Sequence, residues 1–204
     1  MMRVIGGALP SAVYTGTGVI SATATVFTFP TWPISTAASS RYLVICVLSQ
    51  GSLQVSVTVN GVAATHLSSF GPDFWGIAQP AGTTASIQVT MSANVANIVT
   101  IATWALYNLS STTPYAVATS TANPAVLDLN VRNRGIILAE SYSGVNGASF
   151  TWTGVTADYV QTSSINNMPR SGAHVAALSA GTPATVRCAY SASSFPRAVA
   201  LSWR

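Results

Sequence analysis

Gly76-Ile-Ala-Gln-Pro-Ala-Gly-Thr-Thr-Ala-Ser-Ile-Gln-Val89 is a stretch that the chain repeats, in altered form, as His174-Val-Ala-Ala-Leu-Ser-Ala-Gly-Thr-Pro-Ala-Thr-Val-Arg-Cys188. Each copy holds the pattern Ala-Gly-Thr-x-Ala between two short apolar segments. Glycine adopts the positive φ that a tight turn needs, and the alternation of apolar and polar residues is typical of a half-buried strand. Both copies therefore predict a hairpin, with the turns centred on Gly82 and Gly181.

The similarity between the two parts of the chain extends beyond this stretch. Three further pairs of segments match: 41–49 with 134–143, 60–67 with 153–160, and 99–104 with 198–203. We predict an internal duplication with halves at about residues 41–107 and 134–204, related by a pseudo-twofold axis. The alternative is that two unrelated five-stranded meanders with glycine turns resemble each other.

The patterning predicts an all-β fold. No segment shows the 3.6-residue period of an amphipathic helix, and about twelve short segments with the features of strands follow one another. Asn60-Gly61 is the strongest short hairpin signal. With 49% hydrophobic and only 6% charged residues, the chain lacks the composition of a disordered protein. We expect an antiparallel β-sandwich or jelly roll, with residues 19–204 forming a single domain.

Residues 1–18 precede the first predicted strand and are expected to form an N-terminal arm that docks on the domain or on a neighbouring subunit. The candidate docking residues are Arg3, Val4, Ile5, Leu9 and Tyr14. The apolar segment of the arm is interrupted by Pro10 and is too short for a signal peptide. No apolar run in the chain is long enough to predict a membrane-spanning helix.

The eight basic residues are all arginine and are dispersed, with Arg132 and Arg134 as the only close pair. A phosphate-binding surface would need a dense patch, which disfavours nucleic-acid binding. Arginine at a strand end or subunit contact can instead donate to several carbonyl groups. Cys46 and Cys188 lie in predicted strands, where we expect them to be buried free thiols. A disulfide between them is the alternative, because the sequence does not give the geometry that would decide it. No cofactor is indicated, and no His or Cys spacing predicts a metal site.

The sequence does not predict an enzyme. Its four acidic residues are Asp73, Asp128, Glu140 and Asp158. A glycosidase needs two carboxylates that face each other across a sugar, and only Asp73 and Asp158 lie in or near predicted loops. His66 or His174 could accompany one of many serines, but the chain contains no Gly-x-Ser-x-Gly elbow. A cleft that contained both Asp73 and Asp158 would reopen the question.

Aromatic residues near predicted loops are the other candidates for function. The candidate glycan-binding or interface residues are Phe70, Phe74, Trp75, Tyr142, Trp152 and Tyr159. Aromatic rings on a polar surface can stack on sugar rings. The alternative is that Trp75 and Trp152 anchor the core or an interface, as we expect for Trp104 and Trp203.

Several short motifs resemble β-sandwich structural proteins of tailed bacteriophages and phage-like particles, among them head-spike, fibre and decoration proteins. The motifs are Arg41-Tyr-Leu-Val-Ile45, Asn60-Gly-Val-Ala-Ala-Thr65, Pro80-Ala-Gly-Thr-Thr-Ala-Ser-Ile87, Trp152-Thr-Gly-Val-Thr-Ala-Asp-Tyr159 and Ala200-Leu-Ser-Trp203. They extend over most of the chain. The resemblance implies a place in a virion, assembly in the cytoplasm of a bacterial host, and no catalytic residues.

The expected function is therefore that of a virion structural protein, such as a spike, fibre, decoration or accessory subunit. Its expected partners are other virion proteins and further copies of itself in a homo-oligomer, and its contacts could extend to host attachment. The alternative is a carbohydrate-binding module that recognises a host surface glycan through the loop aromatics.

Overall fold

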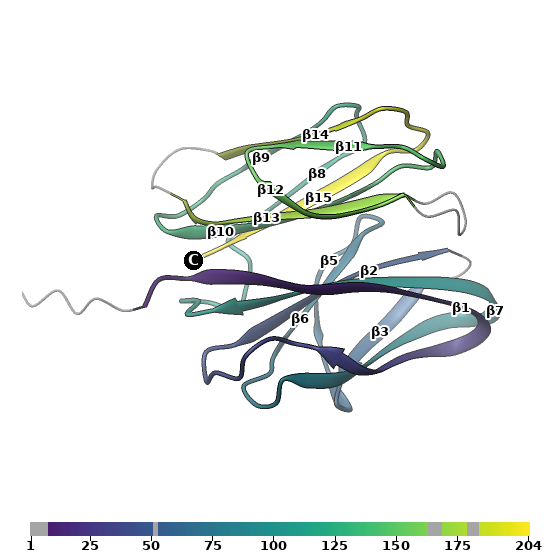
Figure 1. Cartoon of the computed structure of the whole chain (residues 1–204), viewed down its shortest axis with the longest axis horizontal. Helices are drawn as coiled ribbons and strands as arrows, with labels where there is room; N and C mark the ends of the chain where they lie inside the picture. Colours follow the sequence, from purple (N-terminus) through teal and green to yellow (C-terminus); the bar gives the residue numbers. More distant parts are fainter. Residues whose placement is uncertain (1–7, 51–52, 163–168, 179–183) are drawn as a thin grey trace, which may run out of the picture.

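The computed structural model describes residues 8–50, 53–162, 169–178 and 184–204. Over these ranges the protein consists of antiparallel β-strands and contains no helix, which confirms the predicted all-β, sandwich-type fold. The strands form three sheets that lie on one another as layers, with the first sheet in the lower part of Figure 1 and the other two in the upper part.

The first sheet folds over on itself because its two longest strands, β1 and β7, pair along almost their full lengths and bend together. The first half of β7 pairs with β3 and its second half with β2. Three register shifts between β1 and β7 mark bulges, which increase local bending. The strands of this sheet are β1 (Ser11–Pro33), β2 (Tyr42–Gln50), β3 (Gln54–Val59), β4 (Val62–Ala63), β5 (Thr65–Ser68), β6 (Asp73–Ala78) and β7 (Thr84–Tyr107).

The second sheet has the strand order β12-β13-β10-β15-β8, and the third has the order β11-β14-β9. Their strands are β8 (Ala116–Ser120), β9 (Ala125–Leu129), β10 (Gly135–Tyr142), β11 (Phe150–Thr153), β12 (Thr156–Gln161), β13 (Arg170–Leu178), β14 (Ala184–Tyr190) and β15 (Arg197–Trp203). We call the folded first sheet the first unit, and the second and third sheets together the second unit.

Three apolar cores hold these layers together. The first core lies inside the first unit, the third lies between the second and third sheets, and the middle core lies between the units. Alternate residues of β2 enter different cores: Leu43 and Ile45 enter the first core, whereas Val44 enters the middle core. The same holds for β7, β10 and β15. Burial on both faces explains why β2 and β10 are almost continuously apolar in sequence.

The strand pairings of the first unit recur in the second. β2 pairs with β6 and β6 with β5, as β10 pairs with β13 and β13 with β12. β7 corresponds to β14 followed by β15, and β1 corresponds to β9 and β8, which pair with those two strands. The recurring scheme thus includes β1, β8 and β9, which precede the halves predicted from sequence.

The register aligns the two units one residue away from the sequence alignment. Val44 lies opposite Trp104, and Ile136 lies opposite Trp203. The structure therefore matches Val44 with Ile136, whereas the sequence alignment matched it with Ile137. A one-residue shift exchanges the two faces of a strand, and a strand that is apolar on both faces gives the sequence comparison no means of detecting it.

The repeated stretch that includes Gly82 is a turn between two strands, but the predicted hairpin is wrong. Gly82 has the expected positive φ of 74°. However, β6 pairs with β2 and β5, whereas the start of β7 pairs with β3 and β1. The chain thus crosses from one layer of the folded sheet to the other. A hairpin and a crossing between layers produce the same alternation of apolar and polar residues, so the sequence pattern did not distinguish them. The turn at Gly181 lies outside the described residues, and β13 and β14 also belong to different sheets.

The hairpin at Asn60-Gly61 is confirmed. Val59 pairs with Val62 across a two-residue turn in which both residues have positive φ, 50° for Asn60 and 78° for Gly61. This combination suits the right-handed twist of the flanking strands β3 and β4.

The region predicted as an N-terminal arm is in part the beginning of β1. Residues 11–18 pair with the end of β7 in the same chain. Tyr14 stacks on Tyr159 of β12, with ring centroids 5.4 Å apart, so this candidate docking residue is anchored within its own chain. Leu9 is 48% exposed, and its carbonyl accepts a hydrogen bond from Asn108. The candidate residues Arg3, Val4 and Ile5 lie outside the described residues.

We predict that Trp203→Ala lowers the free energy of unfolding by about 3–5 kcal/mol, because the side chain is buried in the middle core and its removal leaves a cavity. Its indole N–H also donates to the Thr112 carbonyl at 3.2 Å. Urea denaturation followed by circular dichroism measures the change. Phe195→Ala is the control, because Phe195 is 84% exposed and its loss should change stability by about 0.5 kcal/mol or less. Equal stability of the two variants would contradict the assignment of the middle core.

Candidate functional site

The six candidate aromatic residues separate into three pairs. Phe74 is buried in the middle core and Trp75 in the first core, and the exposed His66 ring covers Trp75 with ring centroids 4.3 Å apart. These two rings are interior and do not offer a surface to a ligand. Trp152 and Tyr159 belong to a polar cluster between the layers, and Phe70 and Tyr142 line a groove.

The groove, which we call the Phe70 groove, has a volume of about 510 Å³ and lies where the two units meet. The first unit supplies the end of β2, the start of β3 and the loop before β6, and the second unit supplies β10 and β15. Its lining residues are Ser49, Leu53, Gln54, Ser69, Phe70, Gly71, Asp73, Tyr142 and Arg197. Sequence reasoning found Phe70 and Tyr142 but missed Gln54 and Arg197, because no local pattern reveals which distant segments will meet.

Gly71 allows one wall of the groove to close tightly. Its φ is +105°, and a Cβ atom there would lie 2.8 Å from Cδ of Arg197 and 3.1 Å from Cε1 of Tyr142. Glycine is therefore required both by the backbone conformation and by the space available. The Arg197 guanidinium carbon lies 5.5 Å from the centroid of the Phe70 ring, within the range of a cation–π contact.

Asp73 supplies a carboxylate to the lining of the groove. Its Oδ1 accepts a hydrogen bond from the Phe70 amide at 3.1 Å. With its amide nitrogen turned toward the carboxylate, Gln54 donates to Oδ2 of Asp73 and accepts from the Ser49 hydroxyl at 2.8 Å. Burial raises the pKa of Asp73 above its usual range, although the charge of His66, the amides of the loop and Arg197 oppose the shift.

The Phe70 groove has the chemistry of a polar binding site. Two aromatic rings, an amide, a carboxylate, a guanidinium and hydroxyls converge there, which suits a ligand with apolar faces and hydroxyl groups. Asp73 is the one carboxylate among the described residues that line it. Asp158 lies on β12, so the two acidic residues whose meeting would have suggested a glycosidase are at different places.

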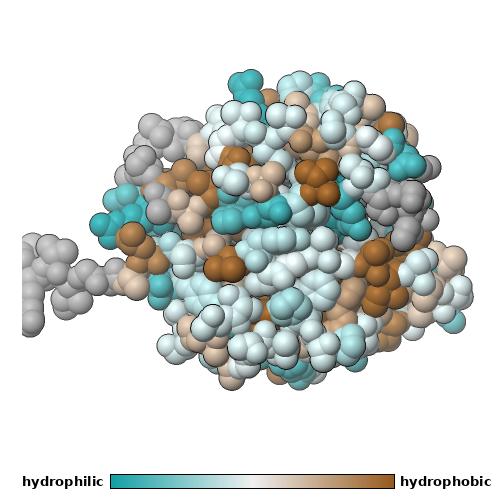
Figure 2. Space-filling view, in the orientation of Figure 1, coloured by the Kyte–Doolittle hydropathy of each residue, from teal (hydrophilic) through white to brown (hydrophobic). Residues whose placement is uncertain are grey.

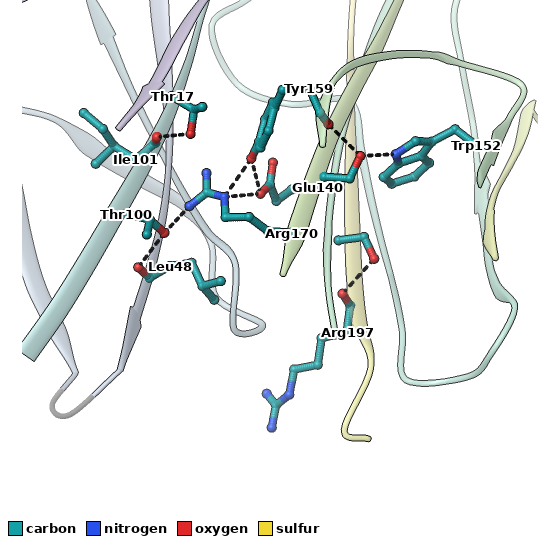
Figure 3. A network of polar contacts seen from close by, with 11 residues as sticks. Thr17, Leu48, Thr100, Ile101, Glu140, Trp152, Tyr159, Arg170 and Arg197 are labelled. Atoms are coloured by element: carbon teal, nitrogen blue, oxygen red, sulfur yellow. Dashed lines mark hydrogen bonds and ion pairs between the residues drawn. The ribbon is translucent and has the colours of Figure 1, made fainter. Parts of the chain in front are cut away.

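A second set of polar residues is buried between the two units (Figure 3). Arg170 on β13 reaches across to the hydroxyl of Thr100 on β7, and its Nε lies 3.0 Å from Glu140 Oε1 and 2.8 Å from the Tyr159 hydroxyl. The Tyr159 hydroxyl donates to Glu140 at 2.5 Å. The side chains of Arg170 and Glu140 are 0% exposed. Burial raises the pKa of Tyr159 well above its usual range, which keeps this phenol protonated as a donor.

Further contacts extend this cluster to the other candidate residues. The Trp152 indole donates to the Ser171 hydroxyl at 2.8 Å, and this hydroxyl donates to the Tyr159 carbonyl at 2.7 Å. Asp158 accepts from the Trp104 indole at 2.8 Å and lies 2.6 Å from Nδ1 of His174. Since Trp104 is on β7, Asp158 also connects the two units. These geometries describe a structural contact between layers.

Arg41 shows the role expected of arginines at strand ends. Its side chain is buried, and its guanidinium donates to four backbone carbonyls. They belong to Ile34, Ser35, Gln79 and Ala81, at distances of 2.6–3.1 Å. Two of these carbonyls lie just before Gly82, so Arg41 fixes the turn through which the chain crosses between layers. Cys46 and Cys188, by contrast, are free thiols buried in different cores.

We predict that Glu140→Gln lowers the free energy of unfolding by about 3–5 kcal/mol, because it leaves the buried charge of Arg170 without its counter-ion. The double variant Glu140→Leu/Arg170→Met should lose less stability than Glu140→Leu and Arg170→Met lose together, since no charge is left unpaired. Urea denaturation of the wild type, both single variants and the double variant measures the four free energies of unfolding that this comparison needs.

The control for this comparison is Asp128→Asn, because Asp128 is exposed and bonds only to the Thr185 hydroxyl among the contacts that the structure describes. It should cost about 1 kcal/mol or less. Additive effects of the two single changes at Glu140 and Arg170 would contradict a coupled ion pair between the strands.

No protein-family model matches this chain, and neither a curated protein nor a solved structure is similar enough to match it. In the part of the chain that the structure describes, no helix is long and apolar enough to cross a membrane. Within the same ranges, no group of three or more His, Cys, Asp or Glu side chains is placed to hold a metal ion.

Proposed function

We propose that this protein is a structural subunit of a bacteriophage or phage-like particle that acts through protein–protein contacts and has no catalytic role. The observation that supports the proposal most is the distribution of charge over the two units. Between residues 4 and 127 the chain contains two charged side chains, Arg41 and Asp73. Arg41 is 1% exposed and Asp73 is half-buried in the Phe70 groove.

The second unit is different. It carries six exposed charged residues within the described ranges: Asp128, Arg132, Arg134, Arg187, Arg197 and Arg204. In Figure 2 the most hydrophilic residues gather over the upper part of the molecule, while much of the lower part has intermediate hydropathy. Exposed charge normally protects a soluble protein from association. A unit without it suits a protein whose surface is covered by neighbouring subunits, as in a particle.

The short motifs described above, from Arg41-Tyr-Leu-Val-Ile45 to Ala200-Leu-Ser-Trp203, add support for a phage-like particle in particular. Spike, fibre and decoration subunits all fit this surface.

The proposal predicts that the protein is found in assembled particles. Particles released from the bacterium that carries the coding sequence would be purified on a density gradient and analysed by quantitative mass spectrometry. We expect the chain to band with the major capsid protein at a fixed copy number. Recovery of the protein only from soluble fractions without particles would contradict the proposal, and a bacterial cytoplasmic protein of similar size is the control for carry-over.

Carbohydrate binding is a second candidate function, and the Phe70 groove is the observation that favours it. Phe70 and Tyr142 offer aromatic rings, Asp73 can accept hydrogen bonds from sugar hydroxyls, and Arg197 and Gln54 can donate them. The two functions are compatible, since a particle subunit that binds a surface glycan would serve host attachment.

We predict that a glycan array detects binding that Phe70→Ala weakens by about tenfold or more, because stacking on an aromatic ring contributes substantially to sugar recognition. Binding should also weaken as pH falls through the raised pKa of Asp73, where the acceptor carboxylate becomes protonated. Phe195→Ala, on an exposed ring outside the groove, is the matched control. An array without signal, or equal binding by both variants, would rule out the groove as a glycan site.

A further inference from the structure

β1 has a free edge along one side of the first unit. The strand pairs with β7, and no other described strand pairs with it. In Figure 1, β1 crosses the near side of the lower unit from one end to the other. A strand with one free edge presents a row of backbone N–H and C=O groups that can pair with another strand.

Between Gly16 and Ala24 this edge lacks the features that normally prevent such pairing, since the bulges and prolines of β1 lie outside that segment. β1 has 23 residues, whereas the other edge strands of the described sheets have two to six. No charged residue occurs from residue 4 to residue 40. Its counterpart in the second unit is divided into two five-residue strands, β8 and β9, and β9 carries the exposed Asp128. Short strands and charges are the usual protection of sheet edges, and β1 has neither.

One part of β1 is regular enough to pair. The register with β7 runs without a shift from Gly16 to Ala24 and changes immediately before and after this segment. Nine residues are sufficient for an ordinary strand pair. A small groove of about 210 Å³ also lies here, lined by Ile20 and residues 28–32, which include Phe29 and Trp32. An added strand can gain affinity from main-chain hydrogen bonds and specificity from a side chain in such a groove.

We propose that residues 16–24 of β1 pair with the same segment of a second copy of this chain, antiparallel about a twofold axis at Ile20. An antiparallel pair of identical strands is self-complementary, which is the geometry of a twofold dimer. This register places Gly16 opposite Ala24 of the partner subunit and Thr17 opposite Thr23 of the partner subunit. Small residues thus meet small residues, and two threonines form a favourable cross-strand pair.

Charge at the edge does not oppose a second copy as the occupant. The chain carries a net charge of +4, but the edge of β1 belongs to the unit that has no exposed charged side chain in the described ranges. Pairing through this edge therefore brings no like charges of the two copies into direct contact. The inference rests on the proposed function in that it assigns the surface through which the subunit associates with itself.

The first test is light scattering and sedimentation of the purified chain over a range of concentrations. We expect a reversible dimer that Thr23→Lys weakens by about tenfold or more, because it places a positive charge at the edge of each copy. The matched control is Gln88→Lys. Gln88 is also exposed and in the same sheet, but β7 is flanked by β1 and β3 at this position. Equal weakening by both substitutions would overturn the proposal.

The second test is cross-linking of Ile20→Cys. Residues at a twofold axis in an antiparallel pair lie about 4.5–5.5 Å apart between Cα atoms, which suits a disulfide. Mild oxidation should yield a covalent dimer, whereas Gln88→Cys should stay monomeric. A chain that is monomeric at all concentrations and does not cross-link overturns the β1 interface. Its presence in purified particles would still support the proposed function, so the two failures can be told apart.

Discussion

The structure depends on four strands, β2, β7, β10 and β15, that are apolar on both faces. Each face of such a strand must be covered, since exposing it would return a large apolar area to water at a cost of about 25 cal/mol per Å². The fold of the first sheet covers one face of β2 and β7, and the third sheet covers one face of β10 and β15. The remaining faces can be covered only by each other, which creates the middle core. The two units are therefore bound together by their central strands and not by a linker.

An interface of alternating apolar strands does not by itself fix how the units are placed, because a shift by two residues would bury similar side chains. The polar contacts across it are directional. Arg170 reaches Thr100, and Asp158 accepts from the Trp104 indole, so each contact ties a residue of the second unit to one position on β7. A buried ion pair adds little net stability, since desolvation offsets the attraction. Because Arg170 and Glu140 both belong to the second unit, they stay paired in any placement, and another placement of the units would instead lose the hydrogen bonds of Arg170 to Thr100 and of Trp104 to Asp158.

Sequence patterning was sufficient for the all-β class and for two turns, but not for the connections or for the length of the two longest strands, because short strands were expected where β1 and β7 have 23 and 24 residues. The Asn60-Gly61 hairpin and the turn at Gly82 follow from local backbone preferences, and both are present. Whether the strands on either side of Gly82 pair with each other depends on which other strands pair with their edges. The alternation of apolar and polar residues is the same in either case and does not show which pairing occurs. The candidate site shows the same limit. Phe70 and Tyr142 were recognisable as aromatics near loops, but the groove also needs Arg197, which comes from a distant strand.

The two units share a pairing scheme but differ in their surfaces, and folding alone does not account for the difference. Both cover a doubly buried pair of strands, and the second unit does so while keeping six exposed charges and a divided, charged counterpart of β1. The first unit could carry exposed charges on β1 at no cost to its core, because Ser21, Ala22 and Thr23 are exposed. Charge at these positions would oppose pairing with another strand. Its absence over the whole edge is what a surface needs if it is to be covered by another protein chain.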